Sequence, residues 1–502
     1  MGSGLPGSIM ALILAKLGYE VLVLEKASHP RFTIGESSTP TADLYLARIA
    51  QDFGIPELAP LSRYASIKES YPQLDVGPKR GFSYFQHQVD RPFTPGPNHE
   101  RELVVAASAS DALSDSNWHR ADIDALVVSL FDKYSVRYLD QCHILDIQPN
   151  EKCWQIATHR DGETESHSAD YFVDATGKEA IGIRSQGGMS CVDELHTSTC
   201  ATFAHFEGLI PWSEFFSPSD SQDHPFPCDR AAIHHILDGQ WMWQLPFDSG
   251  ITSCGIVRPF VSNSHSSTSR SPEDKLAKFM ATVASYPTMK KQFTDAQAVT
   301  PKSGAIETQR IQHYYDRGAG TGWCALPNTV GFVDPLHSKG MAHALSGVYR
   351  LGKLFESGSE NFSASRNEAV QELGEQFRRE ILFMDRIISL CYLALSTPDL
   401  ERFDNFRLAT FWYFVAATCF EKQTFETGNL TNAFLFSDNE DFTSHLFQHE
   451  AKLWDRAKAG DLYSVKELEE LTRHLLDPFD QVRLFRPKIP NMYHRTAAPS
   501  KA

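Results

Sequence analysis

The sequence predicts an α/β protein in which a Rossmann-like dinucleotide-binding domain is interwoven with an antiparallel-sheet substrate domain and followed by a C-terminal helical region. Three observations predict this class. A glycine-rich turn opens the chain ahead of a helix and a strand, residues 241–257 alternate apolar and polar side chains, and the pattern after residue 364 is helical and aromatic. We expect the first part to span 1–360, with substrate-domain segments at about 60–110 and 180–300, and the mainly helical region to span 361–502.

Length, charge and cysteine usage narrow the class of protein. A chain of 502 residues with 42% hydrophobic side chains can bury a large core, and its formal charge of -16 argues against nucleic acid or an anionic membrane as partner. Its nine cysteines are scattered without a Cys-x-x-Cys pair, which predicts reduced thiols and a cytoplasmic location. We expect no metal site, no signal peptide and no transmembrane segment; the longest apolar run, 409–420, predicts a buried helix.

The remaining elements follow in chain order. Residues 5–17 are small and apolar and predict a helix, and residues 20–25 predict a strand that ends in an acid. Further strand-to-turn patterns lie at 170–177 and at 331–334, the second leading into a helix over 341–355. A polar loop is expected at 262–271 and a loose tail at 489–502.

The opening turn has the spacing of a dinucleotide-binding loop. Gly2, Gly4 and Gly7 form G-x-G-x-x-G, in which the glycines permit the tight turn, the close approach of a pyrophosphate and the packing of helix on strand. Pro6 suits the first helical turn, and the helix N-terminus faces the phosphates. Glu25 closes the next strand, where a carboxylate can accept a hydrogen bond from a ribose hydroxyl.

One strand of a Rossmann unit is missing from this pattern. The strand that normally leads into the first glycine has no counterpart, because Gly2 follows Met1 directly. Either the start codon is misassigned or the chain is a fragment. We expect lower stability and weaker flavin retention than in a version extended upstream, and equal retention in the two would contradict this expectation.

Five further stretches carry a family resemblance. They are Gly35-Glu36-Ser37, Trp118 to Asp124 around Arg120, Asp174-Ala175-Thr176-Gly177, Trp241-Met242-Trp243-Gln244-Leu245-Pro246, and the spaced set Phe332, Pro335, Ser338 and Gly340. Together with the glycine turn they cover roughly residues 2–355 and resemble the flavin-dependent halogenases and the related flavin monooxygenases. Two tryptophans at period two in a half-buried strand are often simply core residues. The neighbouring motifs favour the functional interpretation over that alternative.

The resemblance implies a reaction and its reagents. In that family, FAD reduced by a separate flavin reductase reacts with oxygen, and chloride or bromide is converted to hypohalous acid. The Trp241 and Trp243 pair is implied to keep the substrate away from the flavin. A lysine then delivers electrophilic halogen to the substrate; Lys79, flanked by glycines and aromatics, is the best candidate and Lys68 the runner-up. Otherwise either lysine is a solvated surface charge, and Lys68 is expected to form a surface pair with Glu69.

The resemblance also implies which residues surround the cofactor. Asp334 is expected to accept from ribityl or ribose hydroxyls, and the amides of Lys339, Gly340 and Met341 to face the flavin, with Lys339 and Gly340 near a halide. The other implied contacts are Gly2, Gly4, Gly7, Glu25, Glu36, Ser37, Arg120, Asp174 and Gly177. Where tryptophan halogenases carry an acid before the serine, this chain has His337, which puts tryptophan in doubt as substrate; His337 either serves as acid-base or fills a polar pocket.

Several alternatives stay open at this stage. A flavin hydroxylase or epoxidase needs no transfer lysine, and a flavin-dependent C=C reductase shares the glycine turn and the later Asp segment. A non-enzymatic flavoprotein sensor or degenerate interaction module is favoured only by the missing first strand. The substrate of a halogenase is an electron-rich aromatic or a carrier-bound small molecule, and the sequence does not distinguish them.

Overall fold

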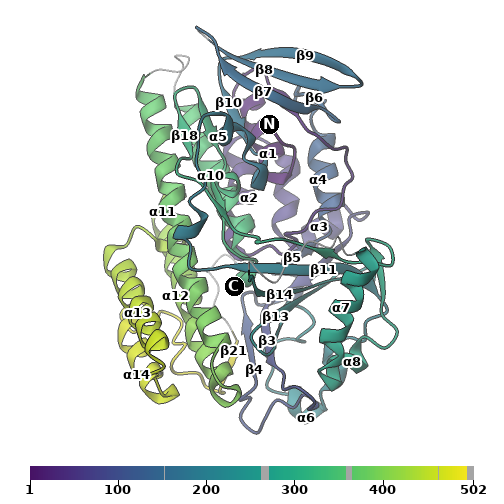
Figure 1. Ribbon diagram of the computed structural model, residues 1–502, viewed down its shortest axis with the longest axis vertical. Coiled ribbons are helices and arrows are strands. Elements are labelled where there is room, and N and C mark those ends of the chain that lie inside the picture. The colour runs from purple at the N-terminus through teal and green to yellow at the C-terminus, as the bar shows by residue number, and fades with distance from the viewer. Residues whose placement is uncertain (152, 262–270, 358–363, 462, 495–502) are drawn as a thin grey trace.

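The computed structural model describes residues 1–502 except for 152, 262–270, 358–363, 462 and 495–502. In Figure 1 the N-terminal helices lie in the upper half, a large sheet lies below them, and the C-terminal helices run along the left side. This arrangement confirms the predicted α/β class. The loop predicted at 262–271 lies outside the described residues except for Ser271, which caps the helix that follows.

The first helix and strand form where the sequence predicts them. α1 (Leu5–Lys16) is apolar and largely buried, and β1 (Leu22–Leu24) follows after a turn at Gly18, whose φ of +90° suits a residue without a Cβ. α4 (Arg120–Ser129) and α10 (Lys339–Glu356) pack on α1, and α2 (Pro40–Asp52) packs on α10. Together these helices bury the apolar side chains of α1.

Two separate groups of parallel strands flank the start of the chain. β1 pairs with β6 (Arg137–Leu139), and β10 (Phe172–Asp174) pairs with β19 (Trp323–Ala325), which also pairs with β18 (Ala319–Gly320). Between the groups, the Met1 ammonium donates to the Val173 carbonyl at 2.9 Å and the Gly2 amide donates to the Leu24 carbonyl at 2.8 Å. Met1 and Gly2 therefore link β1 and β10, at the place where the sequence analysis expected the first Rossmann strand.

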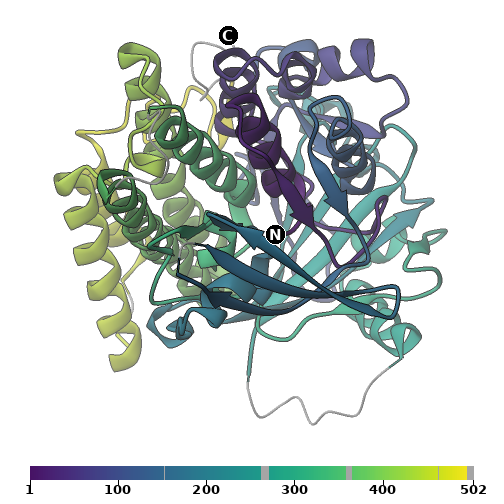
Figure 2. The same ribbon diagram turned by 90° about the horizontal axis from the view of Figure 1, so that it is seen from above.

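A smaller antiparallel sheet lies next to the N-terminus at the top of Figure 1 and in front in Figure 2. Its order is β7-β8-β9, and most residues of the two outer strands are exposed. The strands are β7 (His143–Pro149), β8 (Trp154–Arg160) and β9 (Glu163–Ala169).

The large sheet is mostly antiparallel and runs in the order β15-β11-β14-β13-β12-β3-β4-β21, with β16 also on β11. The β12–β3 and β21–β4 pairs are parallel. Residues 241–257 form β13 and β14, so the predicted antiparallel stretch is confirmed. The strands are β3 (Gly81–Gln86), β4 (Glu102–Ala106), β11 (Thr199–Glu207), β12 (Ala232–Ile236), β13 (Trp241–Pro246), β14 (Thr252–Pro259), β15 (Gln297–Thr300), β16 (Ile306–Glu307) and β21 (Met492–Tyr493).

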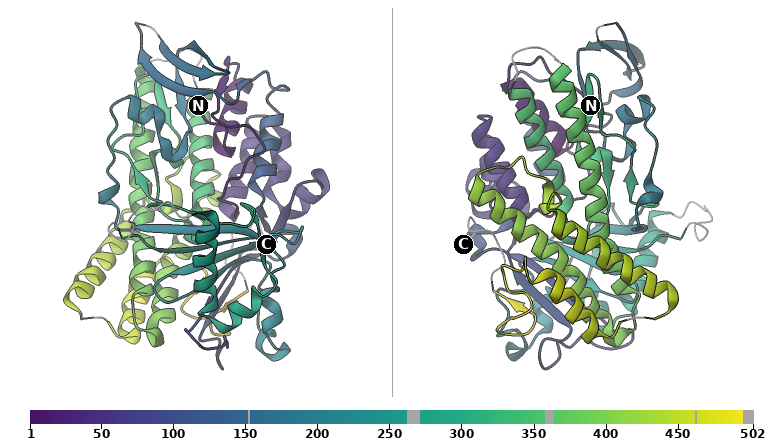
Figure 3. Two further views of the ribbon diagram at one scale, coloured as in Figure 1. Left: turned by 45° about the vertical axis from the view of Figure 1, so that its right-hand side comes forward. Right: turned by 90° about the vertical axis from the view of Figure 1, so that its left-hand side faces the viewer.

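Helices cover one part of this sheet and a separate ribbon borders it. α7 (Pro272–Ala284) and α8 (Pro287–Gln292) pack their apolar side chains on Phe206 and Met242. In the left view of Figure 3, α7 lies in front of the sheet. The ribbon pairs β2 (Val76–Lys79) with β5 (Asp115–Trp118). The shorter elements are η1 (Pro56–Ser62), α3 (Tyr64–Ser70), η2 (Asp111–Leu113), η3 (Gly177–Glu179), α5 (Ile181–Ser185), η4 (Val192–Glu194), η5 (Trp212–Phe215), α6 (Pro218–Ser221), β17 (His313–Tyr314), α9 (Pro327–Val330), β20 (Gly331–Phe332), η6 (Leu336–Ser338) and η7 (Phe434–Phe436).

The chain after residue 363 is largely helical. α11 (Ala364–Leu395) packs against α12 (Asp399–Thr427), with α13 (Glu440–Ala459) and α14 (Val465–Leu476) on their outer side in the right view of Figure 3. The apolar run 409–420 lies buried inside α12, as predicted. Within the described part of the chain, no helix is long and apolar enough to cross a membrane.

The prediction of a loose tail over 489–502 is wrong for part of that range. Met492 and Tyr493 form β21, which pairs in parallel with β4, because both side chains are buried at that sheet edge. Residues 495–502 lie outside the described part.

Candidate active site

A cavity of about 630 Å³ lies where α1, β1 and β13 meet. Its size is within the range of cofactor sites, and its walls come from widely separated segments. The lining includes Gly2, Gly4, Pro6, Glu25, Lys26, Arg31, Thr33, Gly35, Glu36, Ser37, Arg120, Ala175, Thr176, Gly177, Glu179, His234, Trp241, Trp243, Leu245, Phe332, Pro335, Ser338, Gly340 and Met341. All five stretches that carried the family resemblance therefore contribute to one cavity.

The three glycines of the opening turn meet different constraints. A Cβ on Gly2 would lie 2.4 Å from the Ala175 carbonyl oxygen, and a Cβ on Gly7 would lie 2.4 Å from the Gly2 carbonyl oxygen. At Gly4 the nearest atom would be 3.9 Å away, on Arg31, so this position faces open space in the cavity. Gly2 and Gly7 thus permit tight backbone packing, while Gly4 leaves room for a ligand above the α1 N-terminus.

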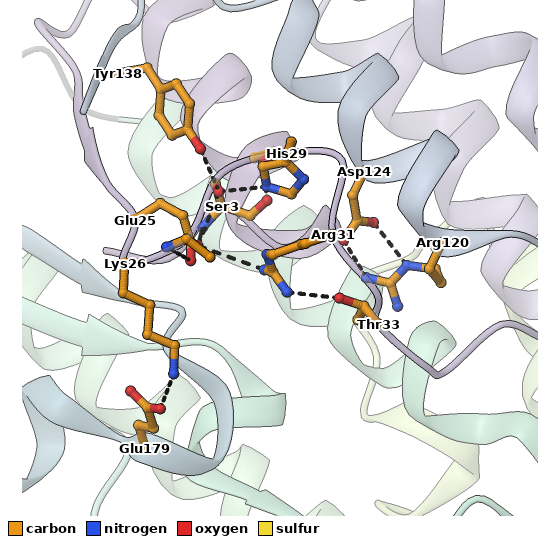
Figure 4. A network of polar contacts seen from close by, with 12 residues as sticks. Ser3, Glu25, Lys26, His29, Arg31, Thr33, Arg120, Asp124, Tyr138 and Glu179 are labelled. Carbon is orange, nitrogen blue, oxygen red and sulfur yellow. Dashed lines mark hydrogen bonds and ion pairs between the residues drawn. The ribbon is translucent and has the colours of Figure 1, made fainter. Parts of the chain in front are cut away.

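Glu25 lies at the centre of a polar network beside that turn (Figure 4). Its Oε2 accepts from the Ser3 amide at 2.8 Å and from the Ser3 hydroxyl at 3.0 Å, and the Arg31 guanidinium is 3.7 Å away. Burial raises the pKa of the Glu25 carboxyl, but the Ser3 amide and Arg31 outweigh it, so the pKa lies below its ordinary value. Glu25 is therefore held as a carboxylate at the cavity wall.

The segment 35–37 and Arg120 form another wall. Arg120 is fixed by a bidentate pair with Asp124, at 2.8 and 3.0 Å, and donates to the Gly35 carbonyl at 3.1 Å. Glu36 Oε1 lies 2.9 Å from His205 Nε2, and both side chains are buried. The sequence analysis named Asp124 only as the end of the Trp118–Asp124 motif and did not single out His205, which comes from β11 with no local signal.

The Ser37 hydroxyl lies 3.0 Å from that of Ser338, its hydrogen-bond donor. This contact joins the segment 35–37 to the turn before α10, so two motifs about 300 residues apart are adjacent in the cavity wall.

The two aspartates expected at the cofactor lie outside the described cavity lining. Asp174 accepts from the amides of Thr176, Gly182 and Ile183 at 3.0, 2.6 and 3.1 Å, and so shapes the turn that presents Gly177. Its carboxylate therefore fixes the backbone of that turn, and a direct contact of Asp174 with the cofactor stays a prediction.

Asp334 has a comparable arrangement near α10. It accepts from the Leu336 amide at 3.0 Å, from the Thr199 hydroxyl at 2.9 Å and from the Tyr392 hydroxyl at 3.0 Å. Burial raises the pKa of this carboxyl above its ordinary value. The two carboxylate oxygens offer about four acceptor sites and these three donors fill three of them, so the bond from Asp334 to a ribityl hydroxyl stays a prediction.

The tryptophan pair of β13 faces the cavity. Trp241 Nε1 donates to the Tyr392 hydroxyl at 2.8 Å, and Trp243 Nε1 donates to Ser253 Oγ at 3.2 Å. A Cβ on Gly255 would lie 2.1 Å from the Trp243 ring, so this glycine makes room for the indole. Tyr392 comes from α11, and the sequence analysis assigned no motif to that region.

Lys79 is fully buried at the end of β2. Its Nζ lies 3.8 Å from Asp115 and 4.1 Å from the centroid of the Phe82 ring. It lies outside the described lining but close to His234, which belongs to the lining. Burial, the larger cause, and the nearby charge of Lys79 lower the pKa of His234 to about 3.

The runner-up lysine is on the surface. Lys68 forms an ion pair at 2.9 Å with Asp248, which comes from the turn after β13. The expected pairing with Glu69 is therefore wrong, because Asp248 approaches from another segment.

His337 sits in an aromatic cluster behind the cavity. It has a positive φ of 66°, its Nδ1 is 3.0 Å from the Tyr84 hydroxyl, and its ring stacks on Tyr413 at 4.7 Å. Burial lowers the pKa of His337 well below its ordinary value, so the ring is neutral at neutral pH. His337 is not among the residues described as lining the cavity. It lies in the aromatic cluster that also contains Phe82 and His234.

The N-terminus of α10 brings the predicted halide residues together only in part. Gly340 and Met341 line the cavity, whereas the Lys339 side chain points to the carbonyls of Asp334 and Leu336, each at 3.1 Å. Burial lowers the pKa of Lys339 to about 8. Its side chain supports the turn before α10, and its backbone amide is the group left for an anion.

Comparisons with known proteins agree with this arrangement. Residues 137–397, more than half of the chain, match the family model for tryptophan halogenase. The chain belongs to the tryptophan halogenase family. The predicted relationship to flavin-dependent halogenases, and the prediction of an enzyme, are therefore confirmed.

Individual relatives extend the match beyond those residues. The monodechloroaminopyrrolnitrin halogenase PrnC of Pseudomonas fluorescens is 26% identical over 422 residues, covering 81% of this chain and 69% of that protein. A 1H-pyrrole-2-carbonyl-[peptidyl-carrier protein] brominase of Pseudoalteromonas luteoviolacea is 24% identical over 69% of this chain and 73% of its own. The crystal structure of halogenase PltM with phloroglucinol and FAD superposes with a TM-score of 0.82 at 22% identity, covering 97% of this chain and 98% of that one, which shows a shared fold.

Proposed function

We propose that this family member binds FAD in the 630 Å³ cavity and halogenates an electron-rich aromatic or carrier-bound small molecule through Lys79. The observation that carries the proposal is Lys79 itself. A lysine with 0% exposure is unusual, and the Lys79 ammonium is held 3.8 Å from Asp115 and over the Phe82 ring, close to His234 of the cavity wall. Family membership favours halogenation over the hydroxylase and C=C reductase alternatives.

The described cavity fits FAD on structural grounds. The open position at Gly4 and the first turn of α1 suit a pyrophosphate, and the Glu25 carboxylate suits a ribose hydroxyl. Arg120, Ser37 and the amides of Gly340 and Met341 are placed for the isoalloxazine end and a halide. When bound, reduced FAD would supply the two-electron chemistry with oxygen that converts chloride or bromide to hypohalous acid.

The tryptophan pair and Lys79 would then position the substrate and the hypohalous acid. Trp241 lines the cavity and stacks on His234, which belongs to the cluster around Lys79. We assign to the Trp241 and Trp243 indoles the role of keeping a substrate in that cluster away from the cofactor. The Lys79 ammonium is a strong donor that can hold hypohalous acid by a hydrogen bond and orient its halogen toward the substrate.

Halogenation of an aromatic ring releases a proton, and the cluster holds neutral imidazoles that can take it. His337 and His234 both have lowered pKa values and are uncharged at neutral pH. We assign this role to His337, because its hydrogen bond to Tyr84 connects it to the aromatic cluster around Lys79.

The substrate and partners follow from the same proposal. The aromatic side chains Phe82, Tyr84 and Tyr413 favour a flat, electron-rich ring. A carrier-bound substrate is supported by the brominase relative, whose printed substrate is tethered to a peptidyl-carrier protein. A separate flavin reductase would supply the reduced cofactor, and the free cysteines among the described residues fit a cytoplasmic location.

The direct test is product analysis. The protein is incubated with FAD, a flavin reductase, NADH, oxygen, chloride or bromide, and a panel of phenols, indoles and pyrroles, both free and carrier-bound. Mass spectrometry should find the halogen isotope pattern in at least one product. Hydroxylated products without halogen would overturn the proposal in favour of a monooxygenase.

A further inference from the structure

Three side chains with metal-binding atoms converge at the start of β4, away from the proposed cofactor cavity. His99, Glu102 and His224 each offer one ligand atom, and these atoms all lie within 4.8 Å of one another. None of the three is among the residues described as lining that cavity. We propose that they bind one zinc ion.

The spacing of the ligand atoms suits a small cation. His99 Nδ1 lies 2.5 Å from Glu102 Oε1, and His224 Nε2 lies 3.1 Å from Glu102 Oε2. A point within about 2.8 Å of three atoms so spaced always exists, and zinc bonds of about 2.0–2.2 Å bring the ligand atoms closer to it. Two ligands of one tetrahedral zinc lie roughly 3.3–3.6 Å apart, so His99 Nδ1 and Glu102 Oε1 must also separate by about 1 Å. Two imidazoles and one carboxylate are a donor set that zinc uses, usually with a fourth position filled by water.

The burial of these residues favours a bound cation. Glu102 has 0% exposure and the His224 side chain is 3% exposed. A buried carboxylate is costly unless a positive charge or several donors compensate it. A zinc ion would supply that charge between the three side chains.

A fourth residue fixes the orientation of one ligand. His99 Nε2 lies 3.4 Å from Asp223 Oδ2. A proton on Nε2 directed at Asp223 leaves the Nδ1 lone pair facing Glu102, an arrangement that is repulsive unless a metal ion or a second proton lies between them. A carboxylate on the far nitrogen of a metal-bound histidine is the usual supporting contact.

The ion would join three separate segments. His99 belongs to the loop between β3 and β4, Glu102 begins β4, and His224 follows α6. The Asn491 side chain donates to the His99 carbonyl at 2.8 Å, which connects β21 to the same point. The zinc would therefore have a structural role at the edge of the large sheet. The sequence predicted no metal because the ligands at 99, 102 and 224 form no local motif.

Zinc binding by the purified full chain tests the proposal. After chelator treatment, titration with ZnCl2 by calorimetry should show one high-affinity site per chain, and crystals grown with zinc should give an anomalous peak among His99, Glu102 and His224. Asp223→Asn should weaken binding ~10- to 100-fold, as loss of a supporting partner does, and Glu102→Gln should weaken it further.

Glu100→Gln is the matched control, because Glu100 is an exposed glutamate in the same loop. It should bind zinc as the wild type does. Should Glu102→Gln fail to fold, His224→Gln and the anomalous map decide in its place. An anomalous map without a peak at the three residues, or zinc affinity unchanged in Asp223→Asn and His224→Gln, would overturn the proposal and leave a hydrogen-bonded ion pair.

Discussion

The two ends of the cavity are built in different ways. At the dinucleotide end, Glu25 is held by Ser3 and Arg31, which lie close to it in the sequence. At the tryptophan end, Trp241 is held by Tyr392, and Tyr392 by Asp334, so three distant segments meet. The first end is a local motif that tolerates changes elsewhere, whereas the second depends on how α11 and α12 pack on the sheet.

Asp334→Ala should have the largest effect on stability, since it acts at the tryptophan end. It leaves three donors, on Leu336, Thr199 and Tyr392, without their buried acceptor. We expect a loss of about 2–5 kcal/mol in the free energy of unfolding, measured with urea. The exposed control Asp146→Ala should change it by less than about 0.5 kcal/mol. Equal losses in the two variants would remove the distinction between the two ends.

Alanine at two glycines separates packing from ligand access at the dinucleotide end. Gly7→Ala places its Cβ against the Gly2 carbonyl, so unfolding should become easier by about 1–3 kcal/mol. Gly4→Ala has room in the protein and should keep its stability, while FAD affinity, measured by flavin fluorescence, falls about tenfold or more. Normal FAD affinity in Gly4→Ala would contradict the placement of the pyrophosphate.

Tyr392→Phe probes the link between α11 and the tryptophan pair. It removes the hydroxyl between Trp241 and Asp334, at a cost of about 1–2 kcal/mol. Because Trp241 loses its anchor, the yield of halogenated product per FAD oxidised should also fall. An unchanged yield would show that Trp241 needs no support from the helical region.

Glu25→Gln should have the smallest effect, and a pH-dependent one. The folded-state pKa of Glu25 lies below its ordinary value of 4.5, so its contribution is present above pH 4.5 and is lost as pH falls through the folded value. As the pH falls below 4.5, the free energy of unfolding should therefore decrease more for the wild type than for Glu25→Gln. Parallel acid unfolding curves would contradict this.

The same contrast explains what the sequence could predict. The glycine turn, α1, β1 and Glu25 are contiguous, so spacing alone places them, and the β13 tryptophans follow from period-two alternation. Tyr392, His205 and Asp115 reach their partners only through the tertiary fold, and no local pattern marks them. The direct roles of Asp174 and Asp334 at the cofactor stay predictions, because a motif identifies the segment but not which of its atoms face the ligand.

The first two residues of the chain show a further limit of sequence patterns. The pattern gave no strand ahead of Gly2, and the structure has Met1 and Gly2 bonded to β10 and β1 on either side. Backbone hydrogen bonds of this kind carry no side-chain signature. The effect of an upstream extension on flavin retention stays a prediction.

The central claim is that Lys79 transfers the halogen, and its replacement tests that claim most directly. Lys79→Ala, and Lys79→Met/Asp115→Asn to keep the buried site uncharged, are compared with the surface control Lys68→Ala for product and for FAD reoxidation. The account predicts at least a ~100-fold loss of halogenated product in both Lys79 variants, with reoxidation within about twofold of the wild type and Lys68→Ala unaffected. Halogenation retained in folded Lys79 variants would contradict the account.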